Sequence, residues 1–207
     1  MPEILDAALY SSPPVQRAGS HRDRLLAAMI EAVNEQGYGA TTVGDVVRRA
    51  HVSKRTFYEH FHDRQDCFVA VFALVSDRML DAITEHVSTE LEWEEQIRAT
   101  IHAYLAGFAA NPTVTSAFLL EIRSAGPRAL GLRRAVIHRL VDVLLGLATD
   151  ARVQDPQLRR LDRETATMIA GGINELMLVA VEEERGHRLP EITDTAVGLI
   201  RAALTAP

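Results

Sequence analysis

The sequence predicts an all-α fold, in which a small N-terminal head of three helices is joined by a long fourth helix to a larger helical body. Apolar residues recur at three- and four-residue steps along most of the 207 residues, which is the spacing of one helix face. Serine, threonine and aspartate stand where several of these periodic segments begin, as helix N-caps do. Glycine and proline separate the segments, so they mark the helix ends.

The first two helices are predicted from their apolar stripes. A helix over residues 21–39 ends at two glycines and carries Leu25, Leu26, Met29, Ile30 and Val33 on one side. A short helix over residues 43–50 has a complete stripe, made by Val43, Val46, Val47 and Ala50. Thr42 is its expected N-cap, and Asp45, three residues later, has the spacing of a capping box.

A second short helix begins after only three further residues. Ser53 is its expected N-cap, while Phe57 and Phe61, four residues apart, share the face that meets the preceding helix. Two short helices joined by a tight turn, with a polar outer face on the second, form a helix-turn-helix. Asp63 then caps the long fourth helix, which connects the head directly to the body.

Positive charge gathers on this motif although the chain is acidic overall. Five basic and two acidic side chains lie from Arg48 to Arg64, a net charge of +3 in a chain of formal net charge −6. Local positive charge attracts phosphate, and the acidic remainder repels it. Because the second helix of a helix-turn-helix enters the DNA major groove, we interpret the cluster as a DNA-binding surface rather than a solvated helix face.

The segment GYGATTVGDVVRRAHVSKRTFYEHFHDRQDCFVAVF resembles the DNA-binding head of the tetracycline-repressor (TetR) family of transcriptional regulators. The similarity covers about residues 25–72 and rests on the order of the glycine-aromatic pair, the double threonine, the basic pair and the T-F-Y-x-H-F run. One departure is His51, which stands in the turn where the family usually has glycine. Histidine tolerates positive φ better than most other residues, so the turn is expected to form.

Eight side chains are predicted to contact DNA, from their place on the motif and from the family's pattern. Lys54 and Arg55 at the helix N-terminus are placed to reach base edges or adjacent phosphates, since arginine binds guanine through two hydrogen bonds. The other six are expected to hold phosphates: Thr42, Ser53, Thr56, Tyr58, His60 and Arg64. Phe57 and Phe61 are expected to form the core of the head.

The last two helices are predicted over residues 162–186 and 192–206, and the first of them is apolar around most of its girth. Such a helix needs cover on several sides, from its own core or from a second subunit. In the resembled family the last two helices form a four-helix dimer interface. A homodimer that meets a palindromic double-stranded DNA operator is therefore expected.

The resemblance also implies a small-molecule effector, bound between helices of the body. Residues on these helices that could line its pocket are Tyr104, Phe108, Phe118, Glu121, Met168 and Asn174. Ordinary core packing is the alternative for each of them. Apolar and aromatic side chains predict a mainly hydrophobic effector of unknown identity with one or two polar groups.

Several classes of protein are not expected. The longest apolar runs fall short of the ~20 residues of a membrane span, and the N-terminus lacks the features of a secretory signal, so a cytoplasmic location is expected. Cys67 has no partner for a disulfide, and the histidines lack the spacing of metal ligands. Since no catalytic motif is present either, we expect no metal, no cofactor and no enzymatic activity.

The expected organisation is a disordered tail over residues 1–20, a DNA-binding domain over residues 21–66 and a ligand-binding and dimerisation domain over residues 67–207. The functional hypothesis is a homodimeric repressor that an effector releases from its operator. An activator, or a repressor without effector, stays open. The alternative from another class is a helical binding protein or enzyme whose head does not read DNA.

Overall fold

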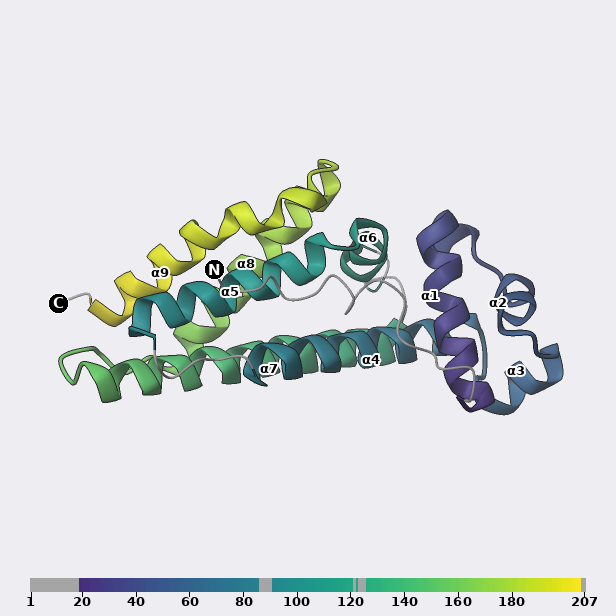
Figure 1. The fold of residues 1–207 in the computed structure, drawn as a ribbon, viewed down its shortest axis with the longest axis horizontal. Coiled ribbons are helices and arrows are strands. Elements are labelled where there is room, and N and C mark those ends of the chain that lie inside the picture. Colours follow the sequence, from purple (N-terminus) through teal and green to yellow (C-terminus); the bar gives the residue numbers. More distant parts are fainter. Residues whose placement is uncertain (1–18, 86–90, 121, 123–125, 206–207) are drawn as a thin grey trace.

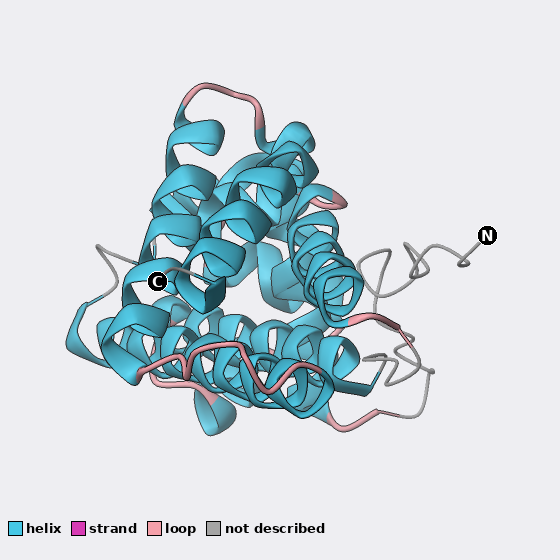
Figure 2. Cartoon of the chain, turned by 90° about the vertical axis from the view of Figure 1, so that its left-hand side faces the viewer, coloured by secondary structure: helices cyan, strands magenta, loops and turns pink. Residues whose placement is uncertain are grey.

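The computed structural model describes residues 19–85, 91–120, 122 and 126–205, and all regular elements in these ranges are helices (Figures 1 and 2). The expected all-α fold, with a helix-turn-helix head on a helical body, is confirmed. In chain order the elements are α1 (His21–Ala40), α2 (Val43–Ala50), α3 (Lys54–His60), α4 (Arg64–Glu85), α5 (Trp93–Ala109), α6 (Pro112–Leu120), α7 (Gly126–Gln154), α8 (Arg163–Glu182), the 3-10 helix η3 (Gly186–Ile192) and α9 (Thr193–Thr205).

The head lies at one end of an elongated molecule. Helices α1, α2 and α3 pack on one another there, and α4 leaves the head to run beside α7 through the body (Figure 1). Helix α5 packs on α9 and η3, while α6 lies between the head and the body and contacts α1. Within the described residues, α4 and α6 therefore make the main contacts of α1 with the rest of the molecule beyond the head.

The helices of the head begin at the N-cap residues that the sequence predicts. The Asp45 amide donates to Thr42 Oγ1 at 3.2 Å and the Thr42 amide to Asp45 Oδ2 at 3.0 Å, which completes the capping box of α2. The Thr56 amide donates to Ser53 Oγ at 3.0 Å. At the start of α4 the Asp66 amide donates to Asp63 Oδ1 at 2.7 Å. A further capping box, Ser20 with Asp23 at the start of α1, was not predicted.

One predicted helix end in the body is wrong. The apolar pattern of residues 113–127 predicts a helix that ends at Gly126, whereas α6 ends at Leu120 and Gly126 begins α7. Glycine is a helix terminator only through its backbone freedom, and it occurs at helix starts as well. The sequence pattern therefore located the break between the two helices but placed it too late.

The core of the head is built on the side chains that the apolar stripes predict. Phe57 is completely buried and Phe61 nearly so, with their ring centroids 5.6 Å apart. Cys67 is also completely buried, and burial raises the pKa of its thiol to about 12. At neutral pH this side chain is therefore a thiol packed as a small apolar residue.

The outer surface of α8 and α9 carries several exposed apolar side chains, with Glu175 and other polar residues exposed among them. Met168, Leu176 and Val179 of α8 and Leu199 of α9 are exposed, and a Cβ added at Gly171 or Gly172 would meet no atom within 4 Å. Helices α8 and α9 pack side by side, so these residues form a surface, which we call the α8–α9 face. Among the residues that the structure describes, no helix combines the length and apolar character that spanning a membrane requires.

We expect Phe57→Ala to destabilise the head by about 3–5 kcal/mol, because it leaves a cavity in a fully buried site. Urea unfolding followed by amide exchange of α1 to α3 measures the loss. Tyr58→Ala, one residue along on the exposed side of α3, is the matched control and should stay within about 1 kcal/mol of the parent. Equal losses for the two variants would contradict the predicted core.

Candidate nucleic-acid interface

Helix α3 presents one apolar face to the head and one polar face to solvent. Phe57 points into the core, whereas Tyr58 is 58% exposed and the side chain of Arg55 is 90% exposed. Lys54, Glu59 and His60 are exposed as well. The outward side of α3 therefore consists of the polar residues that the sequence analysis assigns to DNA.

The basic side chains of the head differ in what they contact. Arg55 Nε donates to Glu59 Oε1 at 3.2 Å within α3, a solvent-exposed pair that another acceptor can replace. Arg49 is paired with Glu35 of α1 and its side chain is only 17% exposed. Arg48 is exposed and donates to Asp45 Oδ1 at 2.6 Å. Of these three arginines, Arg55 is the one that lies on α3 with its side chain exposed to solvent.

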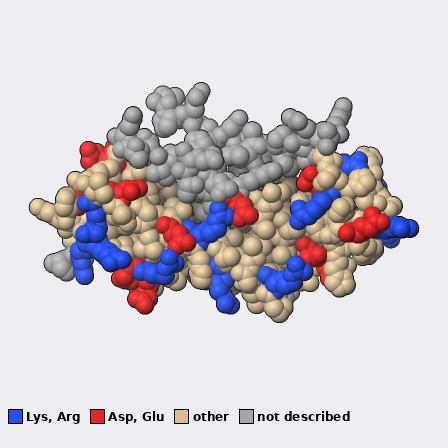
Figure 3. All heavy atoms as spheres, turned by 90° about the horizontal axis from the view of Figure 1, so that it is seen from below, with Lys and Arg blue, Asp and Glu red and all other residues tan. Residues whose placement is uncertain are grey.

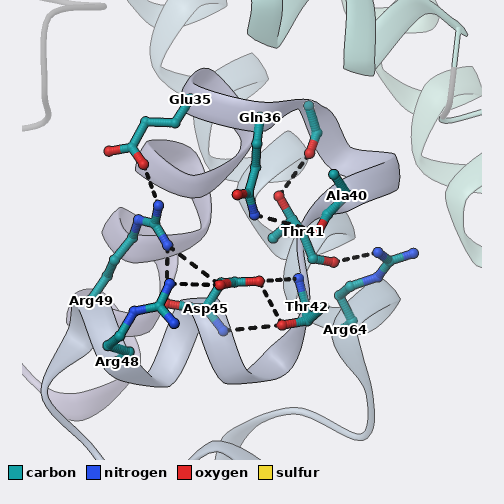
Figure 4. Close-up of polar contacts among 10 residues, drawn as sticks. Glu35, Gln36, Ala40, Thr41, Thr42, Asp45, Arg48, Arg49 and Arg64 are labelled. Carbon is teal, nitrogen blue, oxygen red and sulfur yellow. Dashed lines mark hydrogen bonds and ion pairs between the residues drawn. The ribbon is translucent and has the colours of Figure 1, made fainter.

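The start of α2 is a polar cluster at the surface of the head (Figure 4). Thr42 Oγ1 donates to Asp45 Oδ2 at 2.6 Å. This hydrogen bond and then the Arg48 guanidinium hold the pKa of the Asp45 carboxyl well below its usual range. Asp45 is therefore charged at neutral pH, and its charge is compensated by Arg48 and by the amides of the helix start.

The turn between α2 and α3 is closed by a residue in the left-handed region. His51 has φ 51° and ψ 46°, and the Val52 amide donates to the carbonyl of Val47 at 3.1 Å. This is the pattern of a Schellman helix end, which glycine most often occupies. The expectation that histidine can replace glycine in this turn is confirmed.

The remaining predicted contact residues lie at the starts of α2 and α3 and within α3. Ser53 Oγ and Thr56 Oγ1 lie 3.0 Å apart at the start of α3. The ring of His60 lies beside that of His21 of α1, with centroids 6.3 Å apart. Thr42 and Ser53 begin successive helices and are exposed. Their contacts with DNA remain predictions.

Arg64 lies differently from the other predicted contacts. Its Nη1 donates to the carbonyl oxygens of Tyr38 at 3.0 Å and Gly39 at 3.3 Å. It also donates to the carbonyl oxygen of Thr41, as Figure 4 shows. These contacts span more than twenty residues of sequence, so no helical periodicity could reveal them.

The predicted pocket residues are only partly brought together. Tyr104 and Phe108 of α5 are buried with ring centroids 5.2 Å apart, and burial raises the pKa of the Tyr104 hydroxyl. Phe118 of α6 packs instead on Phe72 of α4, at 4.8 Å between centroids. Asn174 is buried in α8.

The two remaining predicted pocket residues are Met168 and Glu121. Met168 is 69% exposed on the α8–α9 face, so its placement in an interior pocket is wrong for this chain, because the helix turns it away from the core. Glu121 lies outside the described residues. A buried amide that the sequence analysis missed is Gln96 of α5, whose Nε2 has no hydrogen-bond partner; its polar side chain stands at an apolar position of the stripe.

On the face drawn in Figure 3, charge alone does not distinguish the head from the body. Viewed from below, lysine and arginine side chains alternate with aspartate and glutamate along the whole length of the molecule (Figure 3). Several arginines of the body pair with an acidic residue, as Arg163 does with Asp142 and Arg201 with Glu94. The candidate interface is therefore defined by the placement of α3.

Residues 25–71 match the model of the family described as "Bacterial regulatory proteins, tetR family". The fatty acid metabolism regulator protein of Bacillus subtilis is 20% identical over 179 residues, which cover 86% of this chain and 92% of that protein. The HTH-type transcriptional activator FasR of Mycolicibacterium smegmatis is 28% identical over 83 residues, 40% of this chain and 38% of that protein.

Solved structures share the fold over most of the chain. The transcriptional regulator FadR from Bacillus subtilis, solved in complex with stearoyl-CoA, aligns with a TM-score of 0.72 and 16% identity over 88% of this chain and 98% of that one. FadR from Bacillus halodurans aligns with a TM-score of 0.74 and 20% identity over 88% and 95%. The helix-turn-helix geometry and the match of residues 25–71 agree, and this segment is a DNA-binding head of the type found in the tetR family of bacterial regulatory proteins.

Proposed function

We propose that the chain is a transcriptional regulator that binds a specific DNA operator through the outward face of α3. The observation that carries the proposal is the orientation of α3, which buries Phe57 and exposes Lys54 and Arg55 at the helix start. The recognition helix of a helix-turn-helix reads bases with its N-terminal residues. Lys54 and Arg55 are thus assigned to the bases or the phosphates beside them.

The surrounding polar residues position the head on the duplex in this proposal. Their hydroxyl and ring groups are suited to phosphate oxygens, and phosphate contacts fix register without reading sequence. These residues are Thr42, Ser53, Thr56, Tyr58 and His60. Arg64, the eighth predicted contact, differs from these five because its Nη1 donates to carbonyls at the end of α1.

We expect Arg55→Ala to weaken operator binding by roughly 1–3 kcal/mol and to relax the sequence preference at the base pairs it reads. Fluorescence anisotropy on genomic fragments recovered with the pure protein, over a series of salt concentrations, measures both effects. Arg188→Ala is the matched control, since Arg188 is exposed and pairs with Glu191 in the body much as Arg55 pairs with Glu59. A head that does not read DNA would show no salt-sensitive binding in the parent protein.

We infer that the chain forms a homodimer through the α8–α9 face. An exposed apolar row on two adjacent helices, interrupted by two glycines that permit close approach, suits a bundle of two helices from each copy. Two heads held about 34–36 Å apart would then reach successive major grooves of a palindromic operator.

We expect Leu176→Arg to convert the dimer to a monomer, because it places an uncompensated charge in the centre of the apolar row. Light scattering measures the mass in solution, and operator affinity should fall with it. Val153→Arg on α7, at a residue that is 79% exposed, is the control and should leave the mass unchanged. A parent protein with the mass of one chain would rule out this interface.

We also propose that the effector is an amphiphile with a long apolar chain and that it acts by releasing the operator. Support comes from the apolar interior around Tyr104 and Phe108 and from the stearoyl-CoA bound by FadR of Bacillus subtilis. Release requires only that the ligand bind more tightly to the conformation whose heads misfit the operator.

We expect stearoyl-CoA to lower operator affinity by about tenfold or more, within the ~5–150-fold range of typical allosteric coupling. Anisotropy titration of the protein–operator complex measures the shift, with coenzyme A alone as the control for the acyl chain. Tyr104→Phe keeps the ring and removes the buried hydroxyl, so it should weaken only the effector response. A rise in operator affinity would contradict release by the effector, and no response to stearoyl-CoA would exclude this effector class.

A further inference from the structure

The turn between α1 and α2 presents several backbone carbonyls in one place. Gly37 breaks the helical path of α1 with φ 75°, and the chain turns through Thr41 before α2 begins. The hydroxyl of Thr41 donates to the carbonyl of Gly37 at 2.8 Å, and its amide to that of Tyr38 at 3.1 Å. The last carbonyls of a helix lack partners within it, so this turn offers acceptors to a donor from elsewhere.

Arg64, the first residue of α4, supplies that donor. Its Nη1 contacts the carbonyls of Tyr38, Gly39 and Thr41, and its guanidinium carbon lies 4.2 Å from the centroid of the Tyr38 ring. One side chain thus combines hydrogen bonds to the end of α1 with a cation–π contact. The positive charge at a helix C-terminus adds a favourable electrostatic interaction.

The Tyr38 ring continues this contact into the body. It stacks on Phe68 of α4 with centroids 4.1 Å apart, and Phe68 lies 5.7 Å from Phe118 of α6. Phe68 is completely buried and Tyr38 nearly so. Arg64, Tyr38, Phe68 and Phe118 therefore form one row from the α1–α2 turn to α6, which we call the joint.

We propose that Arg64 is a positioning residue, which fixes the α1–α2 turn, and with it α2 and α3, on the first turn of α4. This role differs from the phosphate contact that the sequence suggests, because Nη1 of the guanidinium already donates to carbonyls of the α1–α2 turn. The orientation of α3 relative to α4 then depends on Arg64, although Arg64 itself touches no nucleotide. The inference rests on the proposed function only for its DNA readout.

The test measures specific and nonspecific DNA affinity of Arg64→Ala over a series of salt concentrations. A positioning role predicts about tenfold weaker binding to the operator, with unchanged nonspecific affinity and an unchanged salt slope, since no phosphate contact is lost. Tyr38→Leu, which removes the ring under the guanidinium, should have a similar effect. The double variant should be little worse than either single one, because both break the same contact.

Arg64→Lys separates the two roles even if Arg64→Ala fails to fold. Lysine keeps the charge that a phosphate needs but has no planar group to stack on Tyr38, so positioning predicts that it stays clearly weaker than the parent. A phosphate contact predicts near-parental binding for Arg64→Lys and, for Arg64→Ala, a salt slope smaller by about 0.9 per head. That result would overturn the proposal.

Amide exchange of the protein without DNA tests the role of Arg64 independently of DNA binding. It therefore distinguishes a failure of this inference from a failure of the proposed function. Loss of a positioning contact should accelerate exchange in α2 and at Thr41 in Arg64→Lys, while α5 to α9 exchange as in the parent. Unchanged exchange in the head would contradict positioning whatever the DNA result. If the parent binds no DNA at all, the regulator proposal fails, and the exchange experiment still decides the role of Arg64.

Discussion

Helix α3 has seven residues, too few to stay helical in water by itself, and the burial of Phe57 holds it in place. This ring, together with Phe61, anchors α3 to the rest of the head. Every exposed residue of α3 takes its direction from that anchor, because a helix with one face fixed has its opposite face fixed as well. The orientation of the candidate DNA surface thus depends on the apolar contact that Phe57 and Phe61 make on the opposite face of α3.

The head is connected to the body by more than the covalent chain. The first turn of α4 carries Arg64, which contacts the end of α1, and Asp66, which accepts from the His62 amide at 3.1 Å and pairs with Arg128 of α7 at 3.0 Å. With the stacked rings of the joint, these contacts make α4 the element through which the body can influence the head. A ligand in the body affects DNA binding only by favouring one arrangement of such packed elements over another.

The acidic composition of the chain is compatible with DNA binding because affinity depends on where charges lie. Many arginines of this protein are neutralised by neighbours, and within the head Arg49 is paired with Glu35. Exposed pairs such as Arg55 with Glu59 are weak in water and exchange readily for other acceptors. The net charge of the whole chain therefore says little about the surface of α3.

The sequence by itself determined the helices of the head, their caps at Thr42, Ser53 and Asp63, the burial of Phe57 and Phe61, and the left-handed turn at His51. These features depend on residues within about four positions of one another, so periodicity and capping chemistry reveal them. Only the tertiary structure decided that Arg64 binds the end of α1, that Arg49 meets Glu35 and that Met168 faces outward. Such contacts join residues far apart in sequence or depend on how whole helices rotate against each other, and local patterns carry no information about either.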